Sequence, residues 1–290
     1  MLFSLFIRVS RYLYFKGVAK IPGAIPLFAF LFRLTSPKVI AVHDSKMYMN
    51  PHDAILLSAA ALNSFEPFMT EIFEKELKEG DTVVDLGANI GYYTLLASRL
   101  VGKQGKVYAF EPDPKTYNSL IRNIELNKYS NVVAVQKAVT NKVGTAKFFV
   151  NDNPEFDTLY QPVNHNTFIE VETETLDRFF QDKDDIISVI KMDIEGGEMD
   201  AILEMGRVIN QNKNLKLFVE FGPALIKRAG HSPEEFLHKL LSYNFQIYFI
   251  DEKGKRLKYI SNPAELMEIC EHLGGVELLV SRQPLENKAT

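Results

Sequence analysis

A short run of acids and glycines near position 90 carries the clearest chemical signal in the chain. Asp85, Gly87, Asn89 and Gly91 lie where a predicted strand turns into a helix. Glycines at such a turn let the backbone approach a ligand, and the helix start offers unpaired N–H groups. Glu111 follows the next predicted strand, where a carboxylate can accept two hydrogen bonds from a ribose diol. The spacing therefore predicts a nucleoside site at the carboxyl edge of a sheet.

The acid at the first strand end separates two classes of nucleoside ligand. A dinucleotide site needs Gly-x-Gly-x-x-Gly facing a pyrophosphate, and this chain lacks the middle glycine. Asp85 would repel pyrophosphate but suits a ligand with a cationic amine and a sulfonium. The pattern favours S-adenosylmethionine. A nicotinamide-dependent oxidoreductase is the alternative enzyme, and a purely structural role for Asp85 and Asn89 as helix caps is the other alternative.

A second group of acids follows the fourth predicted core strand. Asp193 could orient an acceptor hydroxyl, take its proton, or ligate a metal together with Glu220 at the next strand end. Glu195 and Glu198 could join it, although acids at a helix start also stabilise the helix itself. We expect no metal site, because two separated carboxylates without a third ligand provide too few oxygen ligands for a hard cation.

One histidine has a position that suits proton transfer. His231 lies in the predicted loop after the fifth strand, at the same edge of the sheet. Histidine titrates near neutrality and can act as a general base, whereas most exposed loop histidines are inert. We take Asp193 and His231 as the candidate catalytic residues.

The elements that must position these residues alternate between strands and helices. This order predicts an α/β fold with a mostly parallel sheet of seven strands, helices on both faces and an antiparallel pair at the end. The expected strands are 82–86, 106–110, 131–136, 187–192, 216–221, 245–250 and 276–280, and the expected helices are 67–78, 92–100, 115–126, 176–180, 197–206 and one that begins at Ser232. Two short strands at 39–42 and 46–49 form a predicted hairpin.

An insertion interrupts the alternating pattern near residues 145–173. Thr145 to Val150 and Phe168 to Thr173 are typical of paired strands around a polar loop. Because loops at a sheet edge often set specificity, we expect acceptor contacts in this loop, at Phe156, Tyr160, Asn164 and His165.

Several motifs in this order resemble the FkbM-type family of S-adenosylmethionine-dependent methyltransferases. They are Phe65-Glu-Pro67, VVDLGANIGYYT from Val83, FEPDP from Phe110, Thr175-Leu-Asp-Arg-Phe179 and IKMDIEGGE from Ile190. The resemblance implies a Rossmann-like class I methyltransferase fold and S-adenosylmethionine as the methyl donor. It also implies that the first motif residues, Asp85, Gly87, Asn89 and Gly91, cradle the methionine part, that Glu111 holds the ribose, and that Val139 and Thr140 lie near the adenine. The implied acceptors are hydroxyls of sugars, glycolipids or polyketide-type molecules.

Charge and cysteine content narrow the partners and the compartment. The 290 residues hold 33 Lys and Arg against 37 Asp and Glu, a net charge of −4. Six of the basic residues and none of the acids lie in the first 43 positions, so the remainder carries −10. Such an acidic body lacks the basic stripe that nucleic-acid binding requires. The single cysteine, Cys270, fits a reducing compartment, and we expect a cytoplasmic protein.

The basic, apolar segment 1–36 is predicted to be an N-terminal extension to a methyltransferase domain at 37–290. Its apolar runs are too short to span a bilayer, and Pro22 and Pro26 break the second of them. Arg8 and Arg11 interrupt the apolar core that a secretory signal needs. A helix here fits either an anionic membrane interface or packing on the domain or a dimer partner. A non-catalytic, membrane-associated protein with a nucleoside pocket is a third hypothesis for the whole chain.

Overall fold

The computed structural model describes residues 37–48, 65–151, 157–162 and 166–285. The chain divides into two compact units, Met1–Glu66 and Pro67–Thr290. In the first unit, β1 (Val39–Val42) and β2 (Ser45–Tyr48) form the predicted antiparallel hairpin. The predicted extension 1–36 lies outside the described residues, so its boundary and its membrane or packing role stay predictions. No helix among the described residues is long and apolar enough to cross a membrane.

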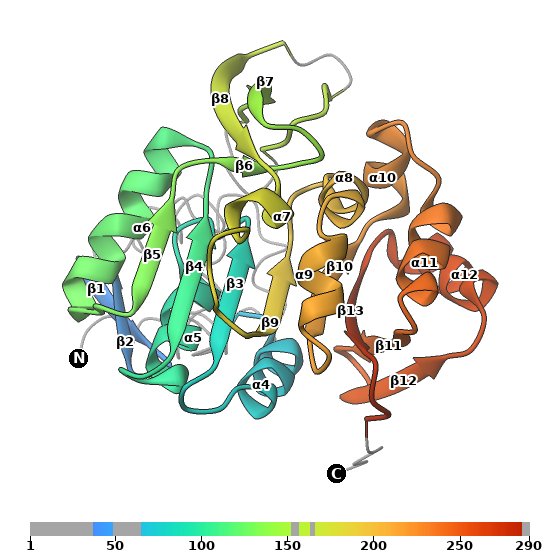
Figure 1. The fold of residues 1–290 in the computed structure, drawn as a ribbon, viewed down its shortest axis with the longest axis horizontal. Helices are drawn as coiled ribbons and strands as arrows, with labels where there is room; N and C mark the ends of the chain where they lie inside the picture. Colours follow the sequence, from blue (N-terminus) through green and yellow to red (C-terminus); the bar gives the residue numbers. More distant parts are fainter. Residues whose placement is uncertain (1–36, 49–64, 152–156, 163–165, 286–290) are drawn as a thin grey trace, which may run out of the picture. The chain divides into compact units, whose positions relative to one another are not determined.

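The second unit is built on one eight-stranded sheet (Figure 1). Five strands run parallel, while β13 lies antiparallel between β10 and β11, and β12 pairs antiparallel with β11. The order across the sheet is β5 (Val132–Val135), β4 (Lys106–Phe110), β3 (Thr82–Leu86), β9 (Ile187–Met192), β10 (Lys216–Phe221), β13 (Val276–Ser281), β11 (Gln246–Asp251) and β12 (Arg256–Ile260). This order confirms the predicted Rossmann-like sheet and its antiparallel end.

The sheet has one strand more than predicted. The eighth strand, β12, lies at the outer edge, and most of its side chains are exposed or half-exposed. Its sequence, Arg-Leu-Lys-Tyr-Ile, alternates between polar and apolar residues over only four positions, and at the edge of the sheet most of these side chains stay exposed. Pairing with β11 supplies the backbone hydrogen bonds that stabilise it.

Alternation along the strands places successive side chains on opposite faces of the sheet. Val84, Leu86 and Met192 belong to a core cluster that also contains residues of the helices on that face. These helices are α7 (Leu176–Phe179), α8 (Glu198–Leu203), α9 (Gly206–Gln211), α10 (Pro223–Arg228), α11 (Pro233–Ser242) and α12 (Pro263–Leu273). Asp85 and Lys191 occupy the intervening positions and therefore face the opposite side of the sheet.

The opposite face is covered by α4 (Pro67–Glu76) and α5 (Tyr92–Val101). Phe73 of α4 packs edge-on against Phe218 of β10, with ring centroids 5.1 Å apart. Phe73 also contacts Tyr93 of α5 at 5.2 Å. The remaining helix, α6 (Pro114–Asn127), follows β4 and begins at Asp113, whose side chain accepts a hydrogen bond from the Thr116 N–H.

The single helix predicted at 197–206 is wrong, because the structure has two short helices there. After α8 ends at Leu203, the carboxylate of Asp177 accepts hydrogen bonds from the backbone N–H groups of Arg207 and Val208, both at 2.8 Å. This cap comes from a residue 30 positions upstream and starts α9 as a new helix. The short helix α10 also occupies part of the stretch that was expected to be a loop.

The insertion forms a separate three-stranded sheet. As predicted, β7 (Gly144–Phe149) and β8 (Phe168–Glu174) pair antiparallel. A two-residue strand that was not predicted, β6 (Ala138–Val139), adds to β8 in parallel. Ala138, Phe148 and Val171 form a small core of their own under this sheet.

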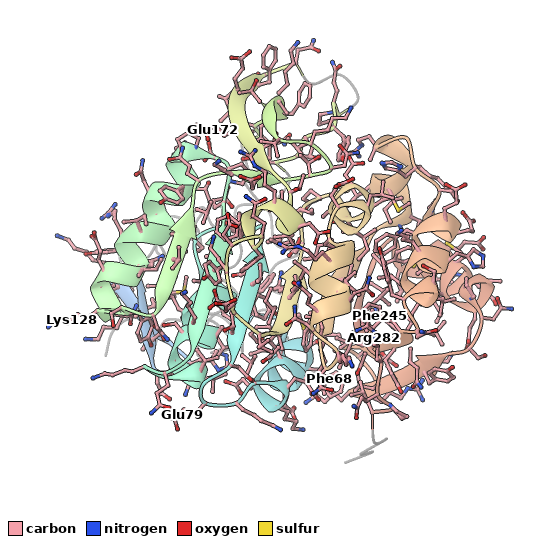
Figure 2. All side chains as sticks on the ribbon, in the orientation of Figure 1. Phe68, Glu79, Lys128, Glu172, Phe245 and Arg282 are labelled. Carbon is pink, nitrogen blue, oxygen red and sulfur yellow. The ribbon has the colours of Figure 1, made fainter. Side chains whose placement is uncertain are left out.

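Arg282 directly follows β13 and binds neighbouring elements of the large sheet (Figure 2). Its guanidinium lies 5.0 Å from the centroid of the Phe245 ring. It also donates hydrogen bonds to the backbone oxygens of Tyr243 and Ile209 at 3.0 and 2.9 Å. The C-terminal strand is thereby attached to α9 and to the start of β11, far from the carboxyl ends of the parallel strands.

Candidate functional site

The turn between β3 and α5 is held in an unusual backbone conformation. Gly87, Asn89 and Gly91 have φ angles of +77°, +49° and +98°, in the left-handed region. The N–H groups of Gly87 and Ala88 donate to the Phe110 oxygen at 3.1 and 2.9 Å. A Cβ atom on Gly87 would collide with the backbone oxygen of Asp193. The turn therefore lies directly against the ends of β4 and β9, and only glycine fits at position 87.

Glu111 fastens the end of β4 to this turn. Its two carboxylate oxygens accept hydrogen bonds from the N–H groups of Asn89 and Asp113, each at 2.9 Å. Burial raises the pKa of Glu111 to about 8, against the lowering effect of those two N–H groups. Each oxygen retains a second lone pair. The side chain thus fits the expected role of accepting hydrogen bonds from a ribose diol.

Asp85 has one satisfied oxygen and one that is not. It is 2% exposed, and its Oδ2 accepts a hydrogen bond from the Thr94 hydroxyl at 2.5 Å. Its Oδ1 is buried and has no hydrogen-bond partner among the described residues. Burial raises the pKa of Asp85, while the Lys191 ammonium acts in the opposite direction. An unsatisfied buried acceptor fits the ammonium group of a methionine moiety.

Lys191 links Asp85 to Asp193 on the neighbouring strand. Its Nζ donates to Asp193 Oδ2 at 2.8 Å and lies 4.7 Å from the centroid of the Tyr93 ring. Burial alone would lower the pKa of Lys191, but the carboxylates of Asp193 and Asp85 outweigh it and raise the pKa. Lys191 is therefore a buried cation, and the Asp193 side chain remains 37% exposed at the edge.

Val139 and Thr140 were predicted in the turn after the third core strand, but Val139 belongs to β6 and Thr140 directly follows it. Both are buried, and the Thr140 N–H donates to the Glu174 oxygen at 3.0 Å. They belong to the junction between the large sheet and the insertion. Their proximity to an adenine stays a prediction.

The structure places His231 on a buried carboxylate that sequence reasoning missed. His231 Nε2 lies 2.8 Å from Asp200 Oδ1, which also accepts from Asn141 Nδ2 at 2.7 Å. The Tyr160 hydroxyl contacts Asp200 Oδ2 at 2.5 Å, and burial followed by this contact raises the pKa of Tyr160. Asp200 lies in the first turn of α8, where acids also stabilise the helix itself. Its three polar partners, Asn141, Tyr160 and His231, come from distant segments, and no local pattern predicts these contacts.

The predicted acids after β9 separate into two roles. Glu198 is buried and accepts a hydrogen bond from the Ile194 N–H at 3.1 Å, which matches the structural alternative of a helix start. Burial raises its pKa to about 7. Glu195, with φ +52°, instead offers its carboxylate to the same small space as Asp193 and Glu220. The sequence suggested two separated carboxylates, and the structure adds a third.

The chain is similar to known methyltransferases. A family model described as the methyltransferase FkbM domain matches residues 85–247. "Methyltransferase 1" of Beauveria bassiana is 27% identical over 57% of this chain and 74% of that protein. "Methyltransferase sdnD" of Sordaria araneosa is 32% identical over 42% of this chain and 46% of that protein. Among solved structures, an rRNA methylase from Streptococcus thermophilus is 13% identical, with a TM-score of 0.40 over 76% of this chain and 94% of that chain.

Proposed function

Because the chain belongs to the FkbM methyltransferase family, we propose that this S-adenosylmethionine-dependent enzyme methylates a hydroxyl oxygen of a sugar, glycolipid or polyketide-type molecule. Asp85, Gly87, Asn89 and Gly91 would hold the methionine part of the donor, and Glu111 would hold its ribose. The family membership favours a methyltransferase over the nicotinamide-dependent oxidoreductase considered from the sequence. The identity of the acceptor does not follow from family membership and is the part of the proposal that the charge distribution at the site supports.

The observation that carries the acceptor class is the excess of carboxylates around Asp193. Lys191 is a buried cation beside it, while nearby acids increase the negative charge at the same edge. These acids are Glu195, Glu198, Glu220 and Glu277. A phosphate-rich acceptor would be repelled here, whereas neutral hydroxyls can donate hydrogen bonds to carboxylates. The charge distribution supports a neutral, hydroxyl-bearing acceptor rather than a nucleic acid.

The reaction requires alignment and removal of one proton. The acceptor oxygen bonds to the methyl carbon of the donor, the carbon–sulfur bond breaks, and its electron pair neutralises the sulfonium. The hydroxyl proton passes to a base, and Asp193 is suited because Lys191 holds its Oδ2 and leaves Oδ1 toward the edge. Since the electrophile is already activated, the residues act mainly by positioning the acceptor for in-line attack.

His231 is the second base that we propose, and Asp200 determines which of its nitrogens acts. A carboxylate oxygen only accepts hydrogen bonds, so the contact with Asp200 places a hydrogen on Nε2. The neutral imidazole then keeps its lone pair on Nδ1. Asp200 is a positioning residue in this proposal, and replacing it with Asn should shift the pH profile of kcat while leaving donor affinity within a few fold.

The proposal is tested with the full chain and a donor that carries a labelled methyl group. Neutral sugars, a glycolipid and a polyketide-type alcohol are offered beside RNA and a mixture of proteins. We expect label in a hydroxyl-bearing acceptor, as an ether that survives mild alkali, and calorimetry should show donor binding without NADH binding. Label in RNA or protein, with none in the alcohols, would contradict the acceptor class.

For the N-terminal segment we propose peripheral contact with an anionic membrane, which would bring a lipid-linked acceptor within reach. The six basic residues of the first 43 positions support it. Vesicles with and without anionic lipid are compared for the full chain and for a chain that lacks residues 1–36. Equal partitioning of the two chains would remove the membrane role.

A further inference from the structure

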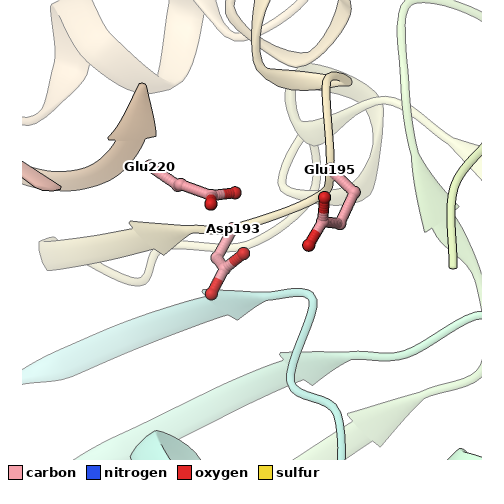
Figure 3. A group of neighbouring side chains, drawn as sticks. All are labelled: Asp193, Glu195 and Glu220. Atoms are coloured by element: carbon pink, nitrogen blue, oxygen red, sulfur yellow. The ribbon is translucent and has the colours of Figure 1, made fainter. Parts of the chain in front are cut away.

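Three carboxylates from two neighbouring strands meet at the edge of the sheet (Figure 3). Asp193 directly follows β9, Glu195 lies two residues later, and Glu220 belongs to β10. One oxygen atom of each side chain can be chosen so that all three lie within 4.8 Å of one another. Each residue of the group is half-buried. The parallel pairing of β9 and β10 brings these acids together, although they are up to 27 residues apart in the chain.

Glu220 has an exceptional environment within this group. Its Oε2 is shielded from solvent and has no hydrogen-bond partner in the part of the chain that the structure describes. Figure 3 shows its carboxylate directed into the space that it shares with Asp193 and Glu195. A carboxylate that is removed from water without a donor or a cation is strongly unfavourable. The orphaned oxygen thus indicates a missing positive partner.

The neighbouring charges increase this need. Glu277 of β13 lies directly opposite Glu220 in the antiparallel pair, and like charges in such a pair repel. The buried ammonium of Lys191 donates its hydrogen bond to Asp193 Oδ2, not to Glu220. Asp85 also interacts electrostatically with this ammonium. Glu220 therefore lies among like charges, and the hydrogen bond of the Lys191 ammonium goes to another carboxylate.

We infer that Asp193, Glu195 and Glu220 bind a divalent cation of the Mg²⁺, Mn²⁺ or Ca²⁺ class. Carboxylate oxygens are the ligands that these hard cations prefer. These cations bind oxygen at about 2.0–2.6 Å, so three oxygens within 4.8 Å of one another can reach one ion after small movements of their side chains. The hydrogen bond from Lys191 to Oδ2 leaves Oδ1 of Asp193 for the cation. While Oδ1 binds the cation, His231 is the proposed base for the acceptor proton.

The place of this cation gives it a role in the transfer. Three protein ligands leave coordination positions open for an acceptor hydroxyl, and a bound cation lowers the pKa of such a hydroxyl. This role rests on the proposed function, because it assumes a hydroxyl acceptor. Cation binding itself depends only on the three carboxylates and can be measured without donor or acceptor.

The binding test uses the full chain after treatment with a chelator and subsequent removal of that chelator. Mn²⁺ is titrated, and the electron paramagnetic resonance signal of the free ion is followed. We expect about one bound Mn²⁺ per chain, at least tenfold weaker binding in Glu220→Gln and Glu195→Gln, and competition by Mg²⁺ or Ca²⁺. Glu271→Gln, an exposed acid in α12, should bind as the wild type does.

Two results would overturn the site. One is a wild-type chain that binds no Mn²⁺ at millimolar concentration, and the other is unchanged affinity in both glutamine variants. Circular dichroism is used to check whether each variant is folded. If Glu220→Gln does not fold, the affinity of Glu195→Gln for Mn²⁺ decides whether the site exists. Methyl transfer is then assayed with chelator and with added Mn²⁺. If the rate of methyl transfer is the same with and without the bound cation, only the role of the cation in transfer is overturned. If no hydroxyl acceptor is methylated, the proposed function is contradicted, and the cation site is not.

Discussion

The ends of β3 and β4 differ from the ends of β9 and β10 in what forms their surfaces. At the first pair, backbone atoms form the site: in the left-handed turn of Gly87 and Asn89, the Asn89 N–H donates to one carboxylate oxygen of Glu111, and the Asp113 N–H donates to the other. At the second pair, side chains form it, and Glu220 keeps a buried oxygen without a partner among the described residues. The proposed donor end, at β3 and β4, is shaped mainly by backbone hydrogen bonds, with Asp85 Oδ1 as its one buried acceptor without a partner among the described residues, whereas the acid end, at β9 and β10, gathers several carboxylates around a single buried cation.

This difference separates binding from chemistry. A backbone cradle that is preorganised by its own hydrogen bonds can bind a ligand with little rearrangement. In a cluster of carboxylates the like charges repel one another until a cation, a proton or a hydrogen-bond donor of the acceptor binds there. We therefore expect changes at the donor end to reduce folding or donor affinity, and changes at the acid end to reduce transfer while the fold persists.

The largest effect is expected from Gly87→Ala. The new Cβ would collide with the backbone oxygen of Asp193, and the φ of +77° adds strain. We expect a loss of several kcal/mol in the free energy of unfolding, measured by urea denaturation. Calorimetry should detect no donor binding. Gly80→Ala is the matched control, because Gly80 has φ +87° but no atom within 4 Å of a new Cβ. It should cost only about 1–2 kcal/mol, and equal losses would refute the close approach.

Asp193→Asn should lower kcat for methyl transfer by about 10²- to 10⁴-fold, since it removes a proton acceptor and a proposed cation ligand. Donor affinity should change by no more than a few fold, because the proposed donor-binding residues lie at the ends of β3 and β4. Stopped assays with labelled donor give kcat, and calorimetry gives the affinity. Asp184→Asn, an exposed acid, serves as the control. Normal transfer by the Asp193 variant would end its catalytic assignment.

Glu111→Gln should weaken donor binding by about tenfold to a hundredfold, the range for losing charge-assisted hydrogen bonds. The raised pKa of about 8 means that the free protein holds a proton on Glu111 at neutral pH. Donor binding requires the carboxylate, so affinity should rise as pH increases toward 8 and then level off. The variant should lack this rise, and calorimetry at several pH values measures both effects.

Glu111 also predicts a pH dependence of stability in the ligand-free chain. Its pKa is raised from 4.5 to about 8 on folding, so between these values the folded state binds more protons than the unfolded state. The free energy of unfolding should therefore fall as pH rises through this window. Glu111→Gln should flatten the curve obtained from denaturant titrations, and an unaltered slope would mean that other groups cause it.

The smallest effect is expected from Glu220→Gln in chelator-treated protein. Burial, followed by the carboxylates of Asp193 and Glu195, raises the pKa of Glu220, so its contribution to stability is lost as pH rises through that value. An amide removes this loss, and the variant should unfold at a slightly higher temperature than the wild type at alkaline pH. Glu271→Gln should show no such gain in thermal unfolding. A clear destabilisation instead would mean that Glu220 has a stabilising partner.

Local patterns in the sequence determined the elements around the donor end. The apolar runs, the glycine turn and the acids at strand ends predict β3, α5 and β4 and place Asp85 beside Glu111 at one edge, as the structure confirms. The spacing of apolar residues and the choice of turn residues can each be recognised within about ten consecutive residues. The seven predicted strands follow from the same signals, and even the antiparallel end is readable from them.

Only the tertiary structure decided which distant side chains meet. The cap that Asp177 provides to α9, the contact of His231 with Asp200 and the approach of Glu220 to Glu195 each join residues at least 25 positions apart. Such contacts depend on strand order and on which face each side chain occupies, and no local pattern encodes either with enough precision. The edge strand β12 was missed for a related reason, because its stability comes from pairing with β11 and not from a buried face of its own.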